Sequence, residues 1–481
     1  MKRLQWGWVI GPVLLTSISG CTVNQPRDVQ VYRQILDSGK SGQSAQVHTG
    51  NSLTLTDALE LANANNEQLA ITGEHYLQAL IDKDRAFAAF LPTISVTPTF
   101  IHQGQTALAA DNPLISAVAP ADATDVPVVG NMNLQPFHDV PALQSAGFVA
   151  QMQRAMLLDR QAILMLDVAK TYFQVLHSEK QVGVLENSIK VAQQRLKDIQ
   201  MKQKTGVARQ VDVSLVESQL SKTHYRLIQA TDDVHNSRAM LAFLIGIPEV
   251  DGPLTDDLSV LATDWQIESL LPLADANRQD LNAERERVKA ASAGLEAAWG
   301  EYFPSVSLNL THYMSRNTFP ADVDWTSLIQ VNIPIFSAGL IHADVRTAYS
   351  RLRQAKLAES YVQRQVLKDL RIAINNLRGD DQQINQLDIQ VKAAREGLRQ
   401  ADAAFNAGLG TNLERLVAQD EFLSAELALS TARFNRNVDY MRLLRVAGVL
   451  NPELSYTLPS AENDFHDMKK RANDDTDNPK E

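Results

Sequence analysis

Two long intervals without proline constrain the fold of this 481-residue chain more than any other feature. No proline occurs between Pro141 and Pro248, an interval of 106 residues, or between Pro334 and Pro452, an interval of 117 residues. Proline breaks a helix because it lacks the backbone N–H and its ring clashes with the preceding turn. Both intervals are therefore predicted to be long helical regions, and their presence in each half of the chain indicates an internal duplication.

The two halves also repeat short motifs in one order. Three pairs of segments match without gaps: 91–96 with 303–308, 132–137 with 331–336, and 205–207 with 407–409. Their offsets are 212, 199 and 202 residues. The fall from 212 to 199 means that the first copy has a loop 13 residues longer between its two strands, where an external loop can grow freely.

Each copy contains two segments in which apolar and polar residues alternate, which is the period of a β-strand. The apolar positions are Ile94, Val96 and Phe100 in the first copy and Val306, Leu308, Leu310, Trp325, Ile329, Val331, Ile333 and Ile335 in the second. Four strands of about ten residues with one apolar face are typical of a membrane β-barrel. They are equally typical of a half-buried sheet in a soluble protein.

The helical region of the first copy carries apolar residues at seven-residue spacing, which predicts a left-handed coiled-coil hairpin. One seam contains Val175, Val182, Ile189, Leu196, Val213, Leu220, Leu227, Val234 and Leu241, and the other contains Leu185, Ala192, Ile199, Val216, Ala230 and Leu244. Gly206 and Gly408 are expected at the turns, because glycine readily takes the left-handed conformation that ends a helix. About 55 to 60 residues before each turn predict a rod of about 85 Å.

The helical region of the second copy has a weaker seam. Its heptad positions are Phe422, Ala425, Leu429 and Ala432, with interruptions at Arg415, Arg436 and Asp439. A narrow apolar stripe predicts helices that pack side by side with another face in water, as the wall of a water-filled helical tube requires.

The amino terminus has the composition of an export signal. Two basic residues precede an apolar stretch over residues 4–18, which ends in small residues before Cys21. Cleavage before Cys21 removes those two charges, so the net charge changes from −11 to −13, and an acidic chain is a poor candidate for binding nucleic acid. As the only cysteine, Cys21 cannot form an intramolecular disulfide. The run 18–21 resembles a bacterial lipobox, which implies a diacylated Cys21 and, because Thr22 follows it instead of aspartate, delivery to the outer membrane.

The sequence contains no recognisable constellation of catalytic residues, so the chain is predicted not to be an enzyme and to need no cofactor or metal. The Gly-Lys-Ser triplet at 39–41 lacks the upstream glycine of a phosphate-binding loop. The ten histidines show no metal-binding spacing, and no Gly-x-Ser-x-Gly motif occurs. His224 and His235 are expected on the surface of a long helix.

The lipobox, the repeated order of helix, strand pair and helical hairpin, and the turn segments 204–212 and 406–414 together resemble the TolC-like outer-membrane efflux proteins, lipoprotein branch. The resemblance implies a mostly α fold with a membrane β-barrel, in which a homotrimer forms one 12-stranded barrel and a periplasmic α-helical tunnel. It further implies a lipid-anchored protein of the cell outer membrane that extends into the periplasm. Its function would be that of a passive exit duct in a tripartite efflux or secretion system, with a periplasmic adaptor, an inner-membrane pump and outer-membrane lipid as partners.

These observations divide the chain into six expected parts. They are a lipoprotein-type signal peptide at 1–20, a lipidated linker at 21–52, the first repeat at 53–247, an equatorial connector at 248–272, the second repeat at 273–450, and a polar tail at 451–481 that is expected to be disordered.

The resemblance also assigns roles to residues at the hairpin tips. Glu414 matches an acidic position of the family's periplasmic gate, Phe405 falls on an aromatic position, and Asp212 is the counterpart of Glu414 in the first copy. Val417 replaces a second acidic position. Glu414 and Asp212 have a second interpretation as helix caps, because acids are favoured in the first turn of a helix. The remaining candidate tip residues, as adaptor contacts, are Gly206, Arg209, Gly408, Gly410 and Thr411.

Two other classes of protein stay open on the sequence alone. A non-channel periplasmic coiled-coil scaffold or adhesin lipoprotein would use the strands as a soluble, half-buried sheet. A lipoprotein hydrolase would require polar residues that converge in a pocket.

Overall fold

The computed structural model describes residues 24–37, 52–104, 121–255, 266–320 and 322–450. Cys21, the signal segment 1–20 and the tail 451–481 lie outside the described residues. The chain forms two compact units. Of the described residues, those within 24–33, 73–156 and 280–362 form one unit, and those within 34–72, 157–279 and 363–450 form the other.

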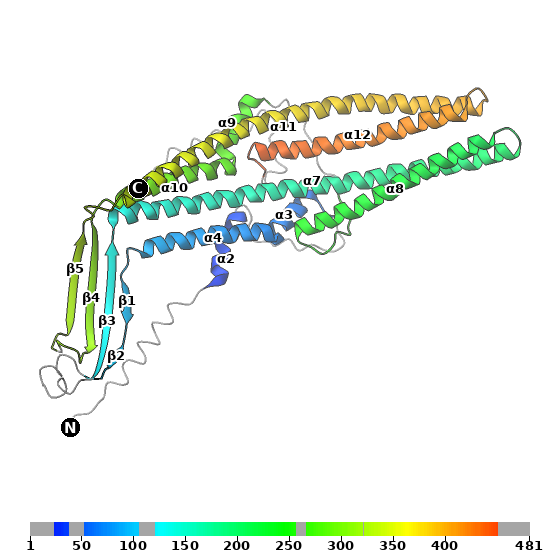
Figure 1. Ribbon diagram of the computed structural model, residues 1–481. Coiled ribbons are helices and arrows are strands. Elements are labelled where there is room, and N and C mark those ends of the chain that lie inside the picture. Colours follow the sequence, from blue (N-terminus) through cyan, green and yellow to red (C-terminus); the bar gives the residue numbers. More distant parts are fainter. Residues whose placement is uncertain (1–23, 38–51, 105–120, 256–265, 321, 451–481) are drawn as a thin grey trace. The chain divides into compact units, whose positions relative to one another are not determined.

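The elements occur twice in one order, as Figure 1 shows by their labels. After α2 (Gln25–Leu36), the first copy contains α3 (Leu55–Asn65), α4 (Glu67–Ala88), β1 (Thr93–Val96), β2 (Thr99–His102), β3 (Asp122–Leu134), α7 (Pro136–Lys204) and α8 (Gln210–Ile245). The second contains α9 (Ile267–Asn277), α10 (Gln279–Gly300), β4 (Ser305–Ser315), β5 (Trp325–Asn332), α11 (Leu340–Asn406) and α12 (Asn412–Val446). The predicted duplication of helix, strand pair and helical hairpin is thereby confirmed.

The two long helices exceed their predicted length. α7 has 69 residues and α11 has 67. At 1.5 Å per residue each is about 100 Å long, so the expected rod of about 85 Å was too short. Part of the difference in α7 lies at its start, because this helix begins at Pro136 and passes through Pro141 at the cost of one backbone hydrogen bond. None of the described helices is both long and apolar enough to cross a membrane.

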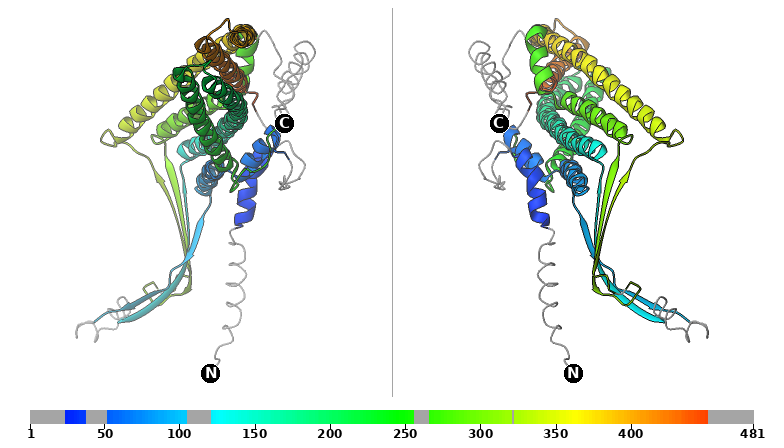
Figure 2. Two further views of the ribbon diagram at one scale, coloured as in Figure 1. Left: turned by 90° about the vertical axis from the view of Figure 1, so that its right-hand side faces the viewer. Right: turned by 90° about the vertical axis from the view of Figure 1, so that its left-hand side faces the viewer.

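The strands form one antiparallel sheet in the order β1-β3-β4-β5, and β2 also pairs with β3. The first strand of the first copy is thus split into β1 and β2 around Pro98, which cannot donate a ladder hydrogen bond. Opposite this break, the β3–β4 register shifts between Val126 and Pro127. Figure 2 shows the sheet bending sharply toward the end where β2 pairs with β3, as a bulge of this kind produces.

The apolar side chains of β1, β2 and β5 are exposed in the protomer, as are several of β4, whereas those of β3 are half-buried or buried. Ile94, Phe100 and Ile329 are 73%, 77% and 68% exposed, and every residue of β5 is exposed. The alternation of apolar and polar residues therefore does not mark a half-buried sheet within the described part of one protomer.

In the second compact unit, the predicted heptad seam is the core of the helical hairpins. Among the seam residues, Leu185, Ala192, Ile199, Val213, Val216, Ala230, Leu241 and Leu244 are buried. Leu185 and Ala230 pack with Leu423 of α12, so the core extends from the first hairpin to the second. Arg415, which interrupts the second seam in the sequence, has a buried side chain. A guanidinium can enter this core because it lies over the ring of Phe405 and its Nη2 donates a hydrogen bond to Asn412 Oδ1 at 3.0 Å.

Glycines at the ends of α8 and α12 reveal the duplication at atomic detail. Gly246 and Gly448 both have φ values in the left-handed region, +70° and +76°. A Cβ at Gly246 would lie 2.6 Å from Asn65 Cβ, and one at Gly448 would lie 2.8 Å from the carbonyl carbon of Asn277. Each hairpin therefore ends against the junction of two short helices, α3–α4 or α9–α10, and both positions require glycine.

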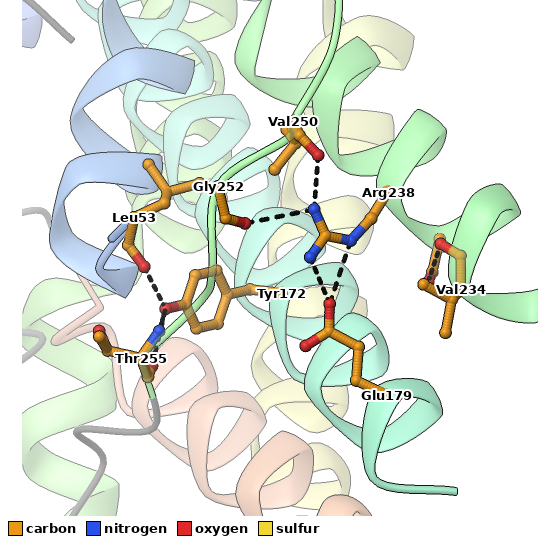
Figure 3. A network of polar contacts seen from close by, with 9 residues as sticks. Leu53, Tyr172, Glu179, Val234, Arg238, Val250, Gly252 and Thr255 are labelled. Carbon is orange, nitrogen blue, oxygen red and sulfur yellow. Dashed lines mark hydrogen bonds and ion pairs between the residues drawn. The ribbon is translucent and has the colours of Figure 1, made fainter. Parts of the chain in front are cut away.

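Tyr172 of α7 fastens the start of the connector, as Figure 3 shows. Its hydroxyl oxygen lies 2.7 Å from the carbonyl oxygens of both Leu53 and Thr255 and accepts a hydrogen bond from Thr255 N at 3.1 Å. Leu53 also forms a parallel bridge with Leu254. The beginning of the first repeat and the connector are thus joined beside α7.

Arg238 of α8 adds a second attachment to the same connector (Figure 3). It donates to the carbonyl oxygens of Val250 at 2.6 Å and Gly252 at 3.2 Å, and its Nε donates to Glu179 of α7 at 3.0 Å. One guanidinium therefore binds α7, α8 and the connector together.

Candidate functional site at the helical hairpin tips

Both hairpin turns depend on a glycine with left-handed backbone conformation. Gly206 has φ +75° and Gly408 has φ +74°. No atom lies within 4 Å of a Cβ placed on either residue, so the turns require the conformation of glycine and not its small size. Gly410 is different, because its Cβ would lie 3.1 Å from Ala404 Cβ. The three glycines occupy the turns that the sequence predicts.

The two acidic tip residues cap the helices that begin beside them. Glu414 Oε2 accepts a hydrogen bond from Thr411 N at 2.8 Å, and Thr411 Oγ1 accepts one from Glu414 N at 3.2 Å, which is a complete capping box. In the first copy, Asp212 Oδ2 accepts from Arg209 N at 3.1 Å and forms an ion pair with the Arg209 guanidinium. The hydrogen bond from the Arg209 side chain is the main cause that lowers the pKa of Asp212.

Glu414 also lies on the edge of an apolar groove between α11 and α12. The groove is lined by Ala394, Gly397, Leu413, Glu414, Val417, Ala418 and Glu421. Leu413 and Val417 are 56% and 61% exposed, and Leu409 in the turn is 87% exposed. The tip of the second hairpin therefore presents apolar surface with two carboxylates beside it.

Phe405 lies between the hairpins. Its ring packs on the cluster of Ile199, Val213, Val216 and Leu416. Lys202 Nζ and Arg415 Cζ each lie 4.2 Å from the ring centroid. Two cations on an aromatic ring are attracted by its electron-rich faces, so Phe405 joins α7 to α12. The structure therefore places this predicted gate residue in the packing between the two hairpins.

A buried ion pair beside Phe405 was not predicted from the sequence. Arg195 of α7 donates to both carboxylate oxygens of Asp402 on α11, at 2.9 and 2.7 Å, and also to Gln419 Oε1 on α12. The Arg195 side chain is 9% exposed and that of Asp402 is 35% exposed. Burial lowers the pKa of Arg195, and the charge of Asp402 opposes this shift. One arginine thus links three helices and both hairpins.

A more exposed group of contacts joins the hairpins on α8 and α12. Asp420 accepts a hydrogen bond from Gln219 at 3.2 Å and forms ion pairs with Lys222 at 3.2 Å and Arg226 at 3.7 Å. Burial would raise the pKa of Asp420, but the hydrogen bonds from Lys222 and Gln219 and the nearby positive charges outweigh it and lower this pKa. The two hairpins are therefore joined by polar contacts as well as by apolar packing.

The sequence contained only a weak signal for the Arg195 pair. Arg195 directly precedes the seam residue Leu196, and Gln419 directly follows a heptad-spaced position in the weaker second seam. A charged residue beside a seam is common on the surface of a coiled coil, so the pattern alone does not identify burial. Within the described ranges, no group of three or more His, Cys, Asp or Glu side chains is arranged to hold a metal ion.

Comparison with known proteins identifies the family. A family model described as outer membrane efflux protein matches residues 58–247 and 270–449, one match in each copy. The chain belongs to the outer membrane efflux protein family. The two matched ranges follow the duplication of this family, with a gap at the connector.

Individual relatives are distant. The pyoverdine export outer membrane protein OpmQ of Pseudomonas putida is 26% identical over 280 residues, which cover 56% of this chain and 59% of OpmQ. The proteases secretion protein PrtF of Dickeya chrysanthemi is 22% identical over 309 residues, which cover 61% of this chain and 66% of PrtF. The chain thus spans less than two thirds of the length of these curated relatives. The crystal structure of the Campylobacter jejuni CmeC outer membrane channel has the same fold, with a TM-score of 0.73 at 13% identity over 90% of this chain and 94% of CmeC.

Proposed function

We propose that this chain is the outer-membrane channel subunit of a tripartite efflux or secretion system. It serves as a passive exit duct for substrates that an inner-membrane pump delivers through a periplasmic adaptor. The observation that carries the proposal is the solvent-exposed apolar face of the sheet. It occurs in a chain that belongs to the outer membrane efflux protein family. Apolar side chains such as Ile94, Phe100 and Ile329 are stable on that face when they contact lipid.

The edges of the sheet support a trimer. β1 and β5 end the strand order, so each has one partner strand within the described protomer. An open edge in lipid would leave backbone N–H and C=O groups without partners, whereas a closed barrel satisfies all of them. β1 and β2 occupy the same position beside β3, so one protomer supplies four strand positions and three protomers supply 12. Four strands alone are too few to enclose a lumen.

The proposal places the mature chain at the outer membrane, anchored by lipid on Cys21. In it, residues 1–20 are the signal peptide, 21–52 the lipidated linker, 248–272 the equatorial connector and 451–481 the tail. The repeats at 53–247 and 273–450 supply the barrel and the periplasmic tunnel of helices. Two acyl chains on one residue give a stable anchor, because each buried methylene contributes about 0.8 kcal/mol.

The proposed gate lies at the hairpin tips. Three copies of Glu414 would place a ring of carboxylates at the closed pore, with Asp212 and Phe405 in supporting positions. Opening requires the second hairpin to move away from the first, which breaks the contact of Arg195 with Asp402. The exposed apolar residues around Leu409 and Val417, together with the turns, are the proposed contact surface for the adaptor.

The scaffold or adhesin alternative predicts that the apolar strand face is covered by protein. In the protomer this face is exposed, and a large exposed apolar surface in water favours aggregation. The membrane assignment therefore explains the observation better.

The mass and heat stability of the detergent-solubilised protein test this proposal. A closed 12-stranded barrel predicts a trimer by light scattering and a band in gel electrophoresis that migrates differently before and after boiling. A monomer whose migration does not change on boiling would contradict the proposed barrel. Such a result would favour the scaffold alternative.

A further inference from the structure

Within the described ranges, one buried carboxyl group of α11, near Asp439 of α12, forms no ion pair. Asp380 of α11 is 8% exposed, and its Oδ2 atom is buried without a hydrogen-bond partner. The arginine that acts on Asp380, Arg436, and the arginine beside Asp439 each have another ion-pair partner. Arg436 pairs with Asp381, and Arg442 pairs with Asp439, both at short range. Among the described residues, Asp380 is the carboxyl of this group for which no ion pair is formed.

The charges that act on Asp380 come from both helices. Burial raises its pKa most strongly, and the negative charges of Asp439 and Asp381 and a hydrogen bond with Asp439 raise it further. The positive charge of Arg436 acts in the opposite direction and is outweighed, so the pKa rises from 3.8 to about 6. Two ionised carboxylates have only acceptor atoms, so a hydrogen bond between them requires a proton on one of them.

We propose that Asp380 and Asp439 form a proton-binding site that makes the packing of α11 on α12 dependent on pH. In mildly acidic medium the two carboxyl groups share one proton, and the contact between the helices is closed. Toward neutral pH the proton leaves. The ionised Asp380 then carries a buried charge that is repelled by Asp439 of α12 and by Asp381 of its own helix, and this weakens the helix contact. Arg436 and Asp439, which interrupt the heptad pattern of the second seam, are thereby part of this proton-binding site.

The direction of the pH effect follows from the raised pKa of Asp380. Between about pH 4, where the unfolded group titrates, and about pH 6, the folded chain binds a proton that the unfolded chain does not bind. The stability that this proton contributes is full below that window. It is lost as the pH rises to about 6 and does not change further above it.

Thermal melting of the purified full chain in detergent, followed by helical circular dichroism from pH 4.5 to pH 8, tests the proposal. Asp380→Asn keeps a neutral, hydrogen-bonding side chain at every pH. We expect its melting temperature to exceed that of the wild type by a margin that grows from pH 4.5 to about pH 6 and stays constant, at a few degrees, above pH 7. The matched control is Asp388→Asn, which removes a carboxylate of the same helix that pairs with Arg433 of α12, is 38% exposed and does not act on Asp380. Its curve is expected to run parallel to that of the wild type.

Parallel curves for the wild type and Asp380→Asn over the whole pH range would overturn the proposal. Asp439→Asn provides a second variant if Asp380→Asn does not fold. It removes the charge that faces Asp380, so the pH step of the wild type is expected to move to lower pH, and an unmoved step would equally overturn the proposal. Infrared spectra give an independent readout, because the carboxylic acid C=O band of the wild type should disappear between pH 5 and pH 7.5 and be absent from Asp380→Asn. None of these measurements depends on channel activity.

Discussion

Removal of the Asp402 carboxylate is the most informative perturbation of the hairpin tips. Loss of one partner from a fully buried ion pair costs about 3 to 5 kcal/mol, because the other charge is left buried. Arg195 is almost completely buried, but the Asp402 side chain is 35% exposed, so water enters the site when the carboxylate is removed. We therefore expect Asp402→Ala to lower the free energy of unfolding by about 2 kcal/mol, a value reduced from the fully buried case.

The matched control is Lys222→Ala in the more exposed contact of the same two hairpins. Lys222 and Asp420 are 45% and 40% exposed, and such a pair contributes about 0.5 kcal/mol. The assay is denaturant unfolding of the purified protein. A rescue variant replaces both partners of the ion pair, Arg195→Met together with Asp402→Leu. Because an apolar pair leaves no buried charge, the double variant is expected to recover most of the lost stability.

The same variants separate stability from gating. If the Arg195–Asp402 contact is present only when the tips are closed, loss of about 2 kcal/mol shifts the closed-to-open ratio by about 30-fold toward the open state. Single-channel recordings of Asp402→Ala should then show a longer open time than those of Lys222→Ala. Equal stability and equal open time in the two variants would refute the assignment of Arg195 and Asp402 as the link between the hairpins.

Three further predictions concern single positions. Gly408→Ala places a Cβ on a residue with φ +74° and is expected to destabilise the second hairpin by about 1 kcal/mol in thermal melts. The control, Gly397→Ala, lies inside α11 with open space around it and should be neutral or stabilising. Thr411→Ala removes the side-chain half of the capping box and should cost about 1 kcal/mol in the same melts, with Thr411→Ser close to the wild type. Cys21→Ser should abolish incorporation of radiolabelled palmitate and release the chain from the membrane anchor, and palmitate retained by that variant would contradict the lipobox assignment.

Much of the fold follows from the periodicity of the sequence. Seven-residue spacing identifies buried residues such as Leu185 and Ile199, because a coiled-coil seam repeats with this period. Gly206 and Gly408 mark the turns because few other residues adopt a positive φ. These signals are local, and a local pattern is sufficient to define a helix, its buried stripe and its end.

Seven-residue spacing along one helix does not predict contacts that involve three helices. Arg195 meets Asp402 and Gln419 only because α7, α11 and α12 converge, and no spacing along one helix encodes that meeting. Arg415 reads as an interruption of a seam for the same reason, although the ring of Phe405 receives it in the structure. A charged residue in a heptad can be exposed or paired, and only the packed structure distinguishes the two.

The break between β1 and β2 has a simpler cause that the sequence did contain. Pro98 lies within the alternating pattern of the first strand, and proline in a strand marks an edge or a bulge. The alternation of apolar and polar residues predicts one strand of about ten residues, whereas the chain forms two strands of four residues each. The apolar pattern predicts the faces of both strands, whereas Pro98 determines where the strand is interrupted.

Electrical recording from the purified protein in a planar lipid bilayer tests the central claim most directly. A trimeric exit duct predicts discrete conductance steps of one size, with opening favoured in Asp402→Ala. A protein that inserts as a trimer and still conducts no current, either alone or with its adaptor, would contradict the assignment of this chain as a channel.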